Sequence, residues 1–291
     1  MIRETLILFV VLTSVVLPTI SSQLPATDVY KIELDANQQP AVIYFMNDYN
    51  VGKYNNQPSF INDTEVLLIS EVNDGNTDVI KWNLRYKSYK RLTSTVENEY
   101  SPKILNKSSF LVVRQEQDGK TQSLWSYPND LSNSGSRLFK DFDNIGYFQP
   151  LSNFKIALFT LEGENSPLYI GNLRNETTIK ISDSVGRCFQ KSNKGELIFM
   201  EKQKSGKFRI KSYNTINQRI DDSAQGLDGS QDFCLFGPRE DLLMAVGPEI
   251  FKFNSNSNSW ILWQDLAKFG ILNITRISSL DNTLLIVNNR P

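Results

Sequence analysis

Six residues suited to ligand recognition lie at, or within one residue of, equivalent positions in a pattern that repeats along this chain. They are two arginines, two tyrosines, one carboxylate and one amide: Gln57, Tyr100, Tyr147, Arg187, Asp232 and Arg276. Arginine forms forked hydrogen bonds with carboxylates and tyrosine offers a flat stacking surface, so the set suits an anionic or carboxylate-bearing ligand. In an alternative interpretation, Asp232 pairs with an arginine across the site and the two tyrosines pack within the fold.

The sequence contains no histidine, which narrows the possible chemistry. Without imidazole there is no Ser-His-Asp or Cys-His catalytic unit and no His-ligated metal. An enzyme that uses an Asp or Glu pair stays an alternative, with Asp232 as its best-placed acid and Glu99 as a neighbour. Asp221, Asp222 and Asp228 lack the alternating oxygen spacing of a calcium loop. We therefore expect no metal site and no cofactor.

Positive and negative charges are nearly balanced, with 31 Lys and Arg against 32 Asp and Glu. Nucleic acids and acidic membranes attract proteins through clustered Lys and Arg. The balance argues against both, and we expect no nucleic-acid partner.

Cys188 and Cys234 are the only cysteines. In an oxidising compartment they could form a disulfide that closes a loop of about 46 residues. Alternatively, each is a small apolar side chain buried separately, because a chain this long can bury an adequate core without a disulfide. The sequence leaves both interpretations open.

The beginning of the chain has the pattern of a secretory signal peptide. Arg3 precedes an apolar run over residues 6–17, LILFVVLTSVVL. At about 1.5 Å per residue this run reaches about 18 Å, well short of the roughly 30 Å of a bilayer core. A cleavable signal therefore explains it better than an uncleaved anchor, and Ser21 and Ser22 place the cleavage near Gln23. We predict a signal peptide over 1–22 and one exported domain, periplasmic or secreted, over 23–291.

A single apolar run recurs six times along the rest of the chain. It occupies residues 66–69, 110–113, 156–159, 197–200, 242–245 and 284–287, with starts 41 to 46 residues apart. This period is typical of a propeller blade of four antiparallel strands, and no segment keeps a helical period over three turns. The sequence therefore predicts an all-β, six-bladed β-propeller. A β-sandwich or a two-domain β protein is the alternative, but neither explains the spacing.

The two ends of the chain supply complementary parts of one blade. The sixth copy ends after its second strand. Residues 28–34 match residues 78–84 nearly position for position, and residues 41–45 follow as an outer strand. We predict that the N-terminal strands complete the C-terminal blade, which closes the ring and pairs edges that would otherwise invite aggregation.

The repeats resemble a known family. Residues 55–60 (NNQPSF), followed by an apolar strand and by residues 78–84 (DVIKWNL), look like the Pro-Asp type repeat of TolB-like six-bladed propellers, and residues 99–102 (EYSP) keep the pattern. The usual Pro-Asp-Gly turn departs from the family pattern in this chain, which affects turn geometry and not blade count. The whole mature chain is similar to stand-alone exported propellers of Bacteroidetes-type bacteria. The resemblance implies a fold and a location, and no reaction.

Two classes of function follow from these predictions. In a propeller the loops that lead into the innermost strands line the mouth of the central channel, where the six residues named first would lie. We expect a monomeric, non-catalytic module that binds a protein, a peptide or an anionic envelope ligand there. The alternative is a hydrolase or lyase with two carboxylates in the channel.

Overall fold

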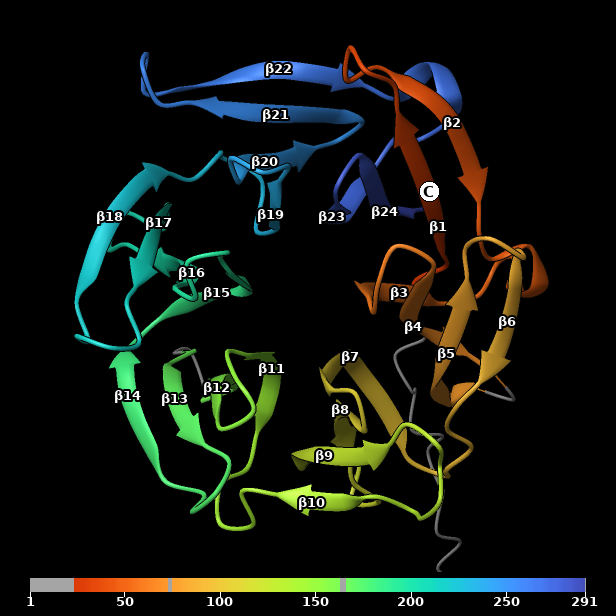
Figure 1. Cartoon of the computed structure of the whole chain (residues 1–291), viewed down its shortest axis with the longest axis vertical. Coiled ribbons are helices and arrows are strands. Elements are labelled where there is room, and N and C mark those ends of the chain that lie inside the picture. The colour runs from red at the N-terminus through yellow and green to blue at the C-terminus, as the bar shows by residue number, and fades with distance from the viewer. Residues whose placement is uncertain (1–23, 73–74, 163–165, 291) are drawn as a thin grey trace, which may run out of the picture.

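The chain folds into a ring of β-sheets, which radiate from a common axis (Figure 1). The computed structural model describes residues 24–72, 75–162 and 166–290. These residues form six four-stranded antiparallel sheets, the blades, so the prediction of an all-β six-bladed propeller is confirmed. The predicted signal peptide lies outside the described residues. In the part that is described, no helix has the length and apolar character needed to cross a membrane.

Each blade holds four strands, which follow one another from the ring axis outward. Blade 1 contains β3 (Asn55–Phe60), β4 (Glu65–Glu71), β5 (Thr77–Asn83) and β6 (Ser88–Arg91), and blade 2 contains β7 (Asn98–Asn106), β8 (Ser109–Gln115), β9 (Gln122–Pro128) and β10 (Ser136–Leu138). Blade 3 contains β11 (Ile145–Pro150), β12 (Lys155–Thr160), β13 (Leu168–Asn172) and β14 (Thr178–Ser182), and blade 4 contains β15 (Val185–Lys191), β16 (Leu197–Lys202), β17 (Phe208–Tyr213) and β18 (Ile220–Gln225). Blade 5 contains β19 (Phe233–Phe236), β20 (Asp241–Val246), β21 (Glu249–Asn254) and β22 (Ser259–Asp265), and blade 6 contains β23 (Ile274–Leu280), β24 (Thr283–Asn289), β1 (Thr27–Leu34) and β2 (Pro40–Phe45). The connections include two short 3₁₀ turns, η1 (Asp48–Asn50) and η3 (Ala267–Phe269).

The hydrophobic core lies between neighbouring blades. The six recurring apolar runs form the second strand of each blade, from β4 to β24. At one junction, Val66 and Leu68 of blade 1 pack with Leu285 and Val287 of blade 6, and all four are fully buried. A strand that is covered on both faces is apolar at every position, which explains why these runs do not alternate.

Blade 6 is built from both ends of the chain, as predicted. Strand β1 pairs with β24 in one continuous register, from Thr27 opposite Asn289 to Glu33 opposite Thr283. Next to the pair of Thr27 and Asn289, Arg290 Nε donates to both carboxylate oxygens of Asp28, at 3.0 and 2.9 Å. Figure 1 shows the result, with the red N-terminal strand β1 beside the dark blue C-terminal strand β24.

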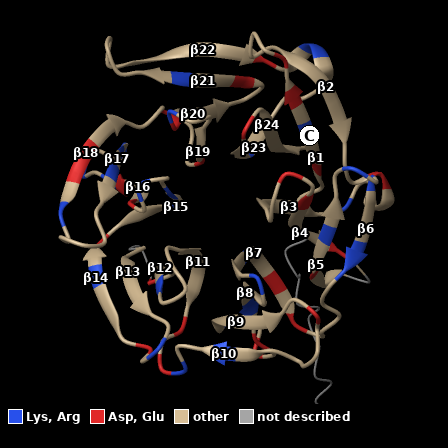
Figure 2. Ribbon diagram, viewed as in Figure 1, with Lys and Arg blue, Asp and Glu red and all other residues tan. Residues whose placement is uncertain are grey.

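Charged residues of both signs are spread around the ring (Figure 2). The three aspartates considered for calcium each form a surface ion pair: Asp221 with Arg219, Asp222 with Arg209 and Asp228 with Lys207. Within the described residues, no group of three or more Cys, Asp or Glu is arranged to hold a metal ion.

The closing blade provides a test of the core. Ile286 of β24 is fully buried between blades 5 and 6, whereas Ile261 of the outer strand β22 is 49% exposed. We expect Ile286→Ala to lower the free energy of unfolding by about 2–5 kcal/mol, because it removes buried methyl groups and leaves a cavity. Ile261→Ala, the matched control, should cost about 0.5 kcal/mol or less. Urea unfolding of both variants measures this, and equal small losses would contradict the assignment of the core.

Candidate functional site

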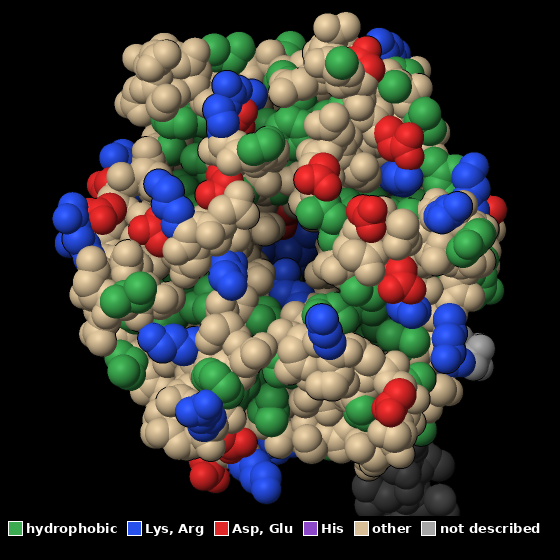
Figure 3. Space-filling view, viewed as in Figure 1, with side chains coloured by type: hydrophobic (Ala, Val, Ile, Leu, Met, Phe, Trp, Pro, Cys, Tyr) green, Lys and Arg blue, Asp and Glu red, His purple; other side chains and the backbone are tan. Residues whose placement is uncertain are grey.

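A cavity of about 290 Å³ lies where the six blades meet. Figure 3 shows a hollow at the centre of one face, with Lys and Arg atoms inside it. The lining comes from every blade: residues 57–60 of β3, 101–104 of β7, 147–149 of β11, 187–190 of β15 and 276–279 of β23, together with Asp232, which precedes β19.

Irregularities in the innermost strands aim side chains into this cavity. Register shifts interrupt β3, β7, β11, β15 and β23 where these strands pair with the second strand of their blades. A bulge adds a residue to one strand, bends it and redirects the side chains beside it. Arg187 and Arg276 both lie at such shifts. The bulges are therefore the local feature that turns polar residues toward the channel axis.

Two of these bulges hold a left-handed residue directly before a proline. Gln57 has φ 56° and precedes Pro58, and Ser101 has φ 53° and precedes Pro102. Residues other than glycine rarely adopt positive φ, and a following proline favours extended backbone instead, so both positions are strained. The Gln57 side-chain oxygen accepts a hydrogen bond of 2.7 Å from Ser101 N, which joins blades 1 and 2 at the cavity.

This geometry corrects one predicted residue. Tyr100 does not line the cavity, whereas Ser101 does. Tyr100 instead packs against buried residues at two blade junctions, and burial raises its pKa. Because successive side chains of a strand point in opposite directions, a register error of one residue exchanges a cavity residue for a packing residue. The shared proline identifies the correct match, since Gln57 and Ser101 both precede one.

The other five predicted residues line the cavity, and five of the six inner strands, all except β19, add lining residues that the sequence comparison missed. Four strands contribute a pair of lining residues two positions apart: Gln57 and Ser59, Ser101 and Lys103, Tyr147 and Gln149, Arg276 and Ser278. Strand alternation explains this spacing. Lys103 is the most consequential residue that was overlooked, and it follows from the alternation only once Ser101 replaces Tyr100 as the matched residue.

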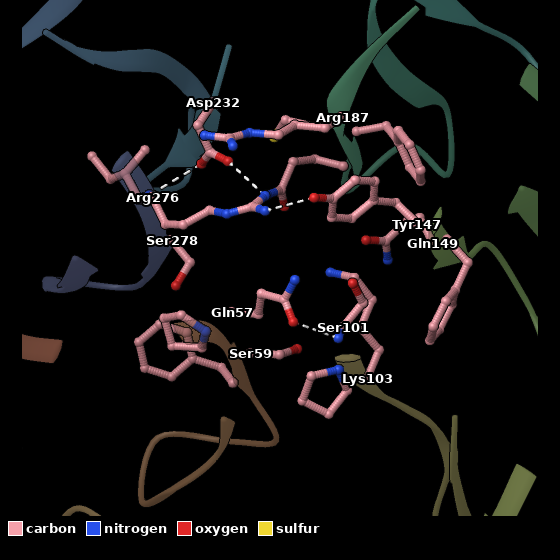
Figure 4. A pocket seen from close by; sticks show the side chains of 18 of the residues that line it. Gln57, Ser59, Ser101, Lys103, Tyr147, Gln149, Arg187, Asp232, Arg276 and Ser278 are labelled. Carbon is pink, nitrogen blue, oxygen red and sulfur yellow. Dashed lines mark hydrogen bonds and ion pairs between the residues drawn. The ribbon is translucent and has the colours of Figure 1, made fainter. Parts of the chain in front are cut away.

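Arg276 is the centre of a hydrogen-bond network across the channel (Figure 4). Its Nη1 contacts Asp232 Oδ2 at 3.2 Å, and its Nη2 donates to the Tyr147 hydroxyl at 3.0 Å, from blade 6 to the opposite blade 3. Asp232 also accepts a bond of 3.0 Å from Ile277 N. Burial alone lowers the pKa of the Arg276 guanidinium, but Tyr147 and Asp232 outweigh it and hold that pKa above its usual range. The alternative in which Asp232 pairs with an arginine is therefore realised, with Arg276.

Two further cations in the cavity form no ion pair with the described residues, although the Asp232 carboxylate attracts both of them. Arg187 Nη2 donates to the carbonyl oxygen of Thr275 at 2.9 Å, while its Nε has no hydrogen-bond partner. Lys103 forms no hydrogen bond or ion pair with the described chain, and burial lowers the pKa of its ammonium. Figure 4 shows both residues at the cavity with Arg276. The cavity therefore has an excess of positive charge.

The two cysteines are free thiols, and both are buried. The Cys188 thiol contacts the backbone of Phe233, donating to its carbonyl at 3.2 Å and accepting from its N–H at 3.4 Å. Cys234 packs in the core between blades 5 and 6. The structure therefore agrees with the interpretation in which each cysteine is buried separately, and not with a disulfide. Burial raises the pKa of both thiols, which keeps them uncharged at neutral pH.

Glu99 lies outside the cavity, between blades 1 and 2. It is fully buried and accepts hydrogen bonds from the hydroxyls of Thr93 and Thr95. Asp78 is also fully buried there and pairs with Arg91 at 2.6 Å. Among the described residues that line the cavity, Asp232 is the single carboxylate. The acid pair that a carboxylate enzyme needs is therefore not found in the described lining.

Solved structures with a similar fold include TolB propellers. The structure of a putative TolB from Agrobacterium tumefaciens aligns with a TM-score of 0.65 and 10% identity, over 92% of this chain and 99% of that chain. TolB from Acinetobacter baumannii aligns with a TM-score of 0.58 and 9% identity, over 91% of this chain and 64% of that chain. A chain of a nidogen–laminin complex aligns with a TM-score of 0.51 and 11% identity, over 87% of this chain and 97% of that chain.

At these identities the likeness concerns the fold alone, and this chain is a six-bladed propeller of the TolB-like fold. No protein-family model and no curated protein matches the sequence.

The buried carboxyl of Glu99 predicts a pH-dependent stability. Burial, with a further contribution from the Asp78 carboxylate, raises the pKa of Glu99 to about 8, compared with about 4.3 in an unfolded chain. The folded state therefore holds this proton more tightly, and its stabilising effect is complete below about pH 4.3 and is lost as the pH rises through about 8.

We expect Glu99→Gln to remove this dependence. Relative to the parent protein, the variant should gain unfolding free energy as the pH rises from 5.5 to 9, by up to about 1.4 kcal/mol per pH unit. Chemical unfolding at a series of pH values measures the difference. A difference that stays constant with pH would show that Glu99 is ionised in the folded protein at neutral pH. The test uses the change of this free-energy difference with pH and not its absolute value, because the amide also changes the hydrogen bonds to Thr93 and Thr95.

Proposed function

We propose that this chain is an exported, non-catalytic binding module that recognises a protein, a peptide or an anionic envelope ligand at its channel. The observation that carries the proposal is the pair of cations, Lys103 and Arg187, that line the cavity and form no ion pair with the described residues. Asp232, which carries the single carboxylate among the described residues that line the cavity, forms an ion pair with Arg276. Charges withdrawn from water are normally paired, because desolvation of an isolated ion is costly. An incoming anion would supply the missing partner.

The fold supports a binding role as well. In this closed ring, polar residues from six blades converge on one cavity. Among the proteins of similar fold, the nidogen–laminin structure is by its name a complex of two proteins. Preorganised sites bind with less loss of conformational entropy. We propose that the ring acts as a monomer with one ligand site.

The binding proposal is tested by removing the two unpaired charges. In the channel variant, Lys103→Met with Arg187→Met, we expect capture of the envelope ligand to be lost, because the ligand no longer finds its two cations. The matched control, Arg85→Ala with Lys90→Ala, removes the same charge from exposed positions near β6 and should keep full capture. The measurement is quantitative capture from an envelope extract by the immobilised proteins.

Both variants must first show the melting temperature of the parent protein to within a few degrees. Equal capture by the parent, the channel variant and the control would contradict a ligand site at the channel. Loss of capture in the control alone would place binding on the outer surface instead.

Export is tested at the N-terminus of the full-length chain. We expect the exported protein to begin at Gln23 or Ser22, since signal peptidase cleaves after small residues. Val11→Arg, which breaks the apolar run, should block processing and keep the protein inside the cell. N-terminal sequencing and cell fractionation measure both outcomes. An exported product that retains Met1 would contradict the predicted signal peptide.

A further inference from the structure

The formal charges of the described residues that line the channel cavity sum to +2. Four charged side chains line it: the cations Lys103, Arg187 and Arg276 and the carboxylate Asp232, so that three positive charges less one negative leave two. Arg276 and Asp232 neutralise each other in an ion pair of 3.2 Å whose side chains are 14% and 11% exposed. The two surplus charges therefore lie on Lys103 and Arg187.

We propose, on the basis of the binding function proposed above, that this cavity is a site for a small organic dianion. One negative charge is placed against Lys103 and the other against Arg187, with hydroxyl groups of the lining as further donors. The shared chemistry is two negative charges on one small molecule, as in a phosphomonoester or a dicarboxylate. A ligand with that charge neutralises the cavity, whereas a monoanion leaves one cation without a partner.

Three residues that line the cavity each carry a buried polar atom that has no hydrogen-bond partner among the described residues. Ser101 Oγ, Ser278 Oγ and Arg187 Nε are buried polar atoms with no hydrogen-bond partner, and all three residues line the cavity. Ser101 is only 6% exposed. Because buried polar groups are nearly always hydrogen-bonded in proteins, three such atoms at one cavity point to a missing acceptor. They belong to β7, β23 and β15, so rotation of these side chains could bring hydrogen-bonding groups to a ligand from three blades.

The size and walls of the cavity favour a small ligand. Its volume of about 290 Å³ is at the lower end of the range of about 300–1,000 Å³ for small-molecule pockets. Apolar residues such as Phe60 and Ile104, both partly exposed, also belong to the lining. Walls of low dielectric constant strengthen the attraction between a cation and an anion, and they also give an organic body a surface to contact. The cavity therefore suits a compact molecule with two charged groups.

The two arginines are held in place before a ligand arrives. Arg187 is anchored by the bond from its Nη2 to Thr275, which leaves its Nε free. The neighbouring Arg276 is fixed by Asp232 and Tyr147, so it cannot turn away from the cavity without breaking both bonds. Ser101 is positioned by its backbone bond to Gln57. A site that is already ordered loses less entropy when it binds.

Titration calorimetry with the mature chain, residues 23–291, tests the inference. The probes are phenyl phosphate, succinate and acetate, at pH 7.5 and constant ionic strength. We expect phenyl phosphate or succinate to bind at least about tenfold more tightly than acetate, because each engages both cations. Tighter binding of phenyl phosphate identifies a phosphomonoester site, and tighter binding of succinate identifies a dicarboxylate site. Dianions that bind no more tightly than acetate to the parent protein would overturn the inference, and this result needs no variant.

Single variants locate the two charges. Lys103→Met and Arg187→Met should each weaken binding of the preferred dianion at least about tenfold. The control that lacks Arg85 and Lys90 should bind like the parent protein. Unchanged affinity in either single variant would overturn the placement of the dianion between these two cations.

The two proposals fail in different ways. If the channel variant loses capture of the envelope ligand while neither dianion binds the parent protein, the binding function stands and the dianion site is wrong. If a dianion binds as expected while capture of the envelope ligand is unaffected in the channel variant, the cavity is a small-molecule site and the envelope-binding function is wrong.

Discussion

The antiparallel pairing of β1 with β24 is the constraint on which the rest of the structure depends. Every blade needs a neighbour on each face, because the core lies between blades. Without β1 and β2, blade 6 would keep two strands, and the apolar faces of blades 5 and 1 would lose part of their cover. Closing the ring also creates the cavity, since its lining comes from all six blades. Stability and binding site therefore depend on the same pairing.

The closed ring also explains the electrostatics of the channel. The closed ring brings together, near its axis, charged side chains that water would solvate on an open sheet. Asp232 forms an ion pair with Arg276, whereas Lys103 and Arg187 form no ion pair with the described residues. Strained backbone at Gln57 and Ser101 is maintained there by the bulges and by the bond between the two residues. Strain and unpaired charge at one place, on an otherwise well-packed frame, are features of sites that bind ligands.

Much of this could be predicted from the sequence, because propeller blades repeat. The period of the apolar runs determines the number of blades, and the fragments at the two ends determine how the ring closes. Five of the six proposed site residues line the cavity because equivalent positions in equivalent blades face the same axis. Tyr100 was the exception, since period-two alternation makes an alignment shifted by one residue point to the opposite side of the strand.

By itself, the sequence determined the fold, the joining of the two ends, the absence of histidine and the kinds of polar residue available at the channel. Only the tertiary structure decided which charges are paired. Arg276 and Tyr147 are 129 residues apart and meet across the ring, while Glu99, one residue before Tyr100, turns into a blade junction. The spacing of residues along the chain indicates which face of a strand each residue occupies. Which charged side chains form ion pairs depends on distances between blades, and these distances are set only when the ring closes.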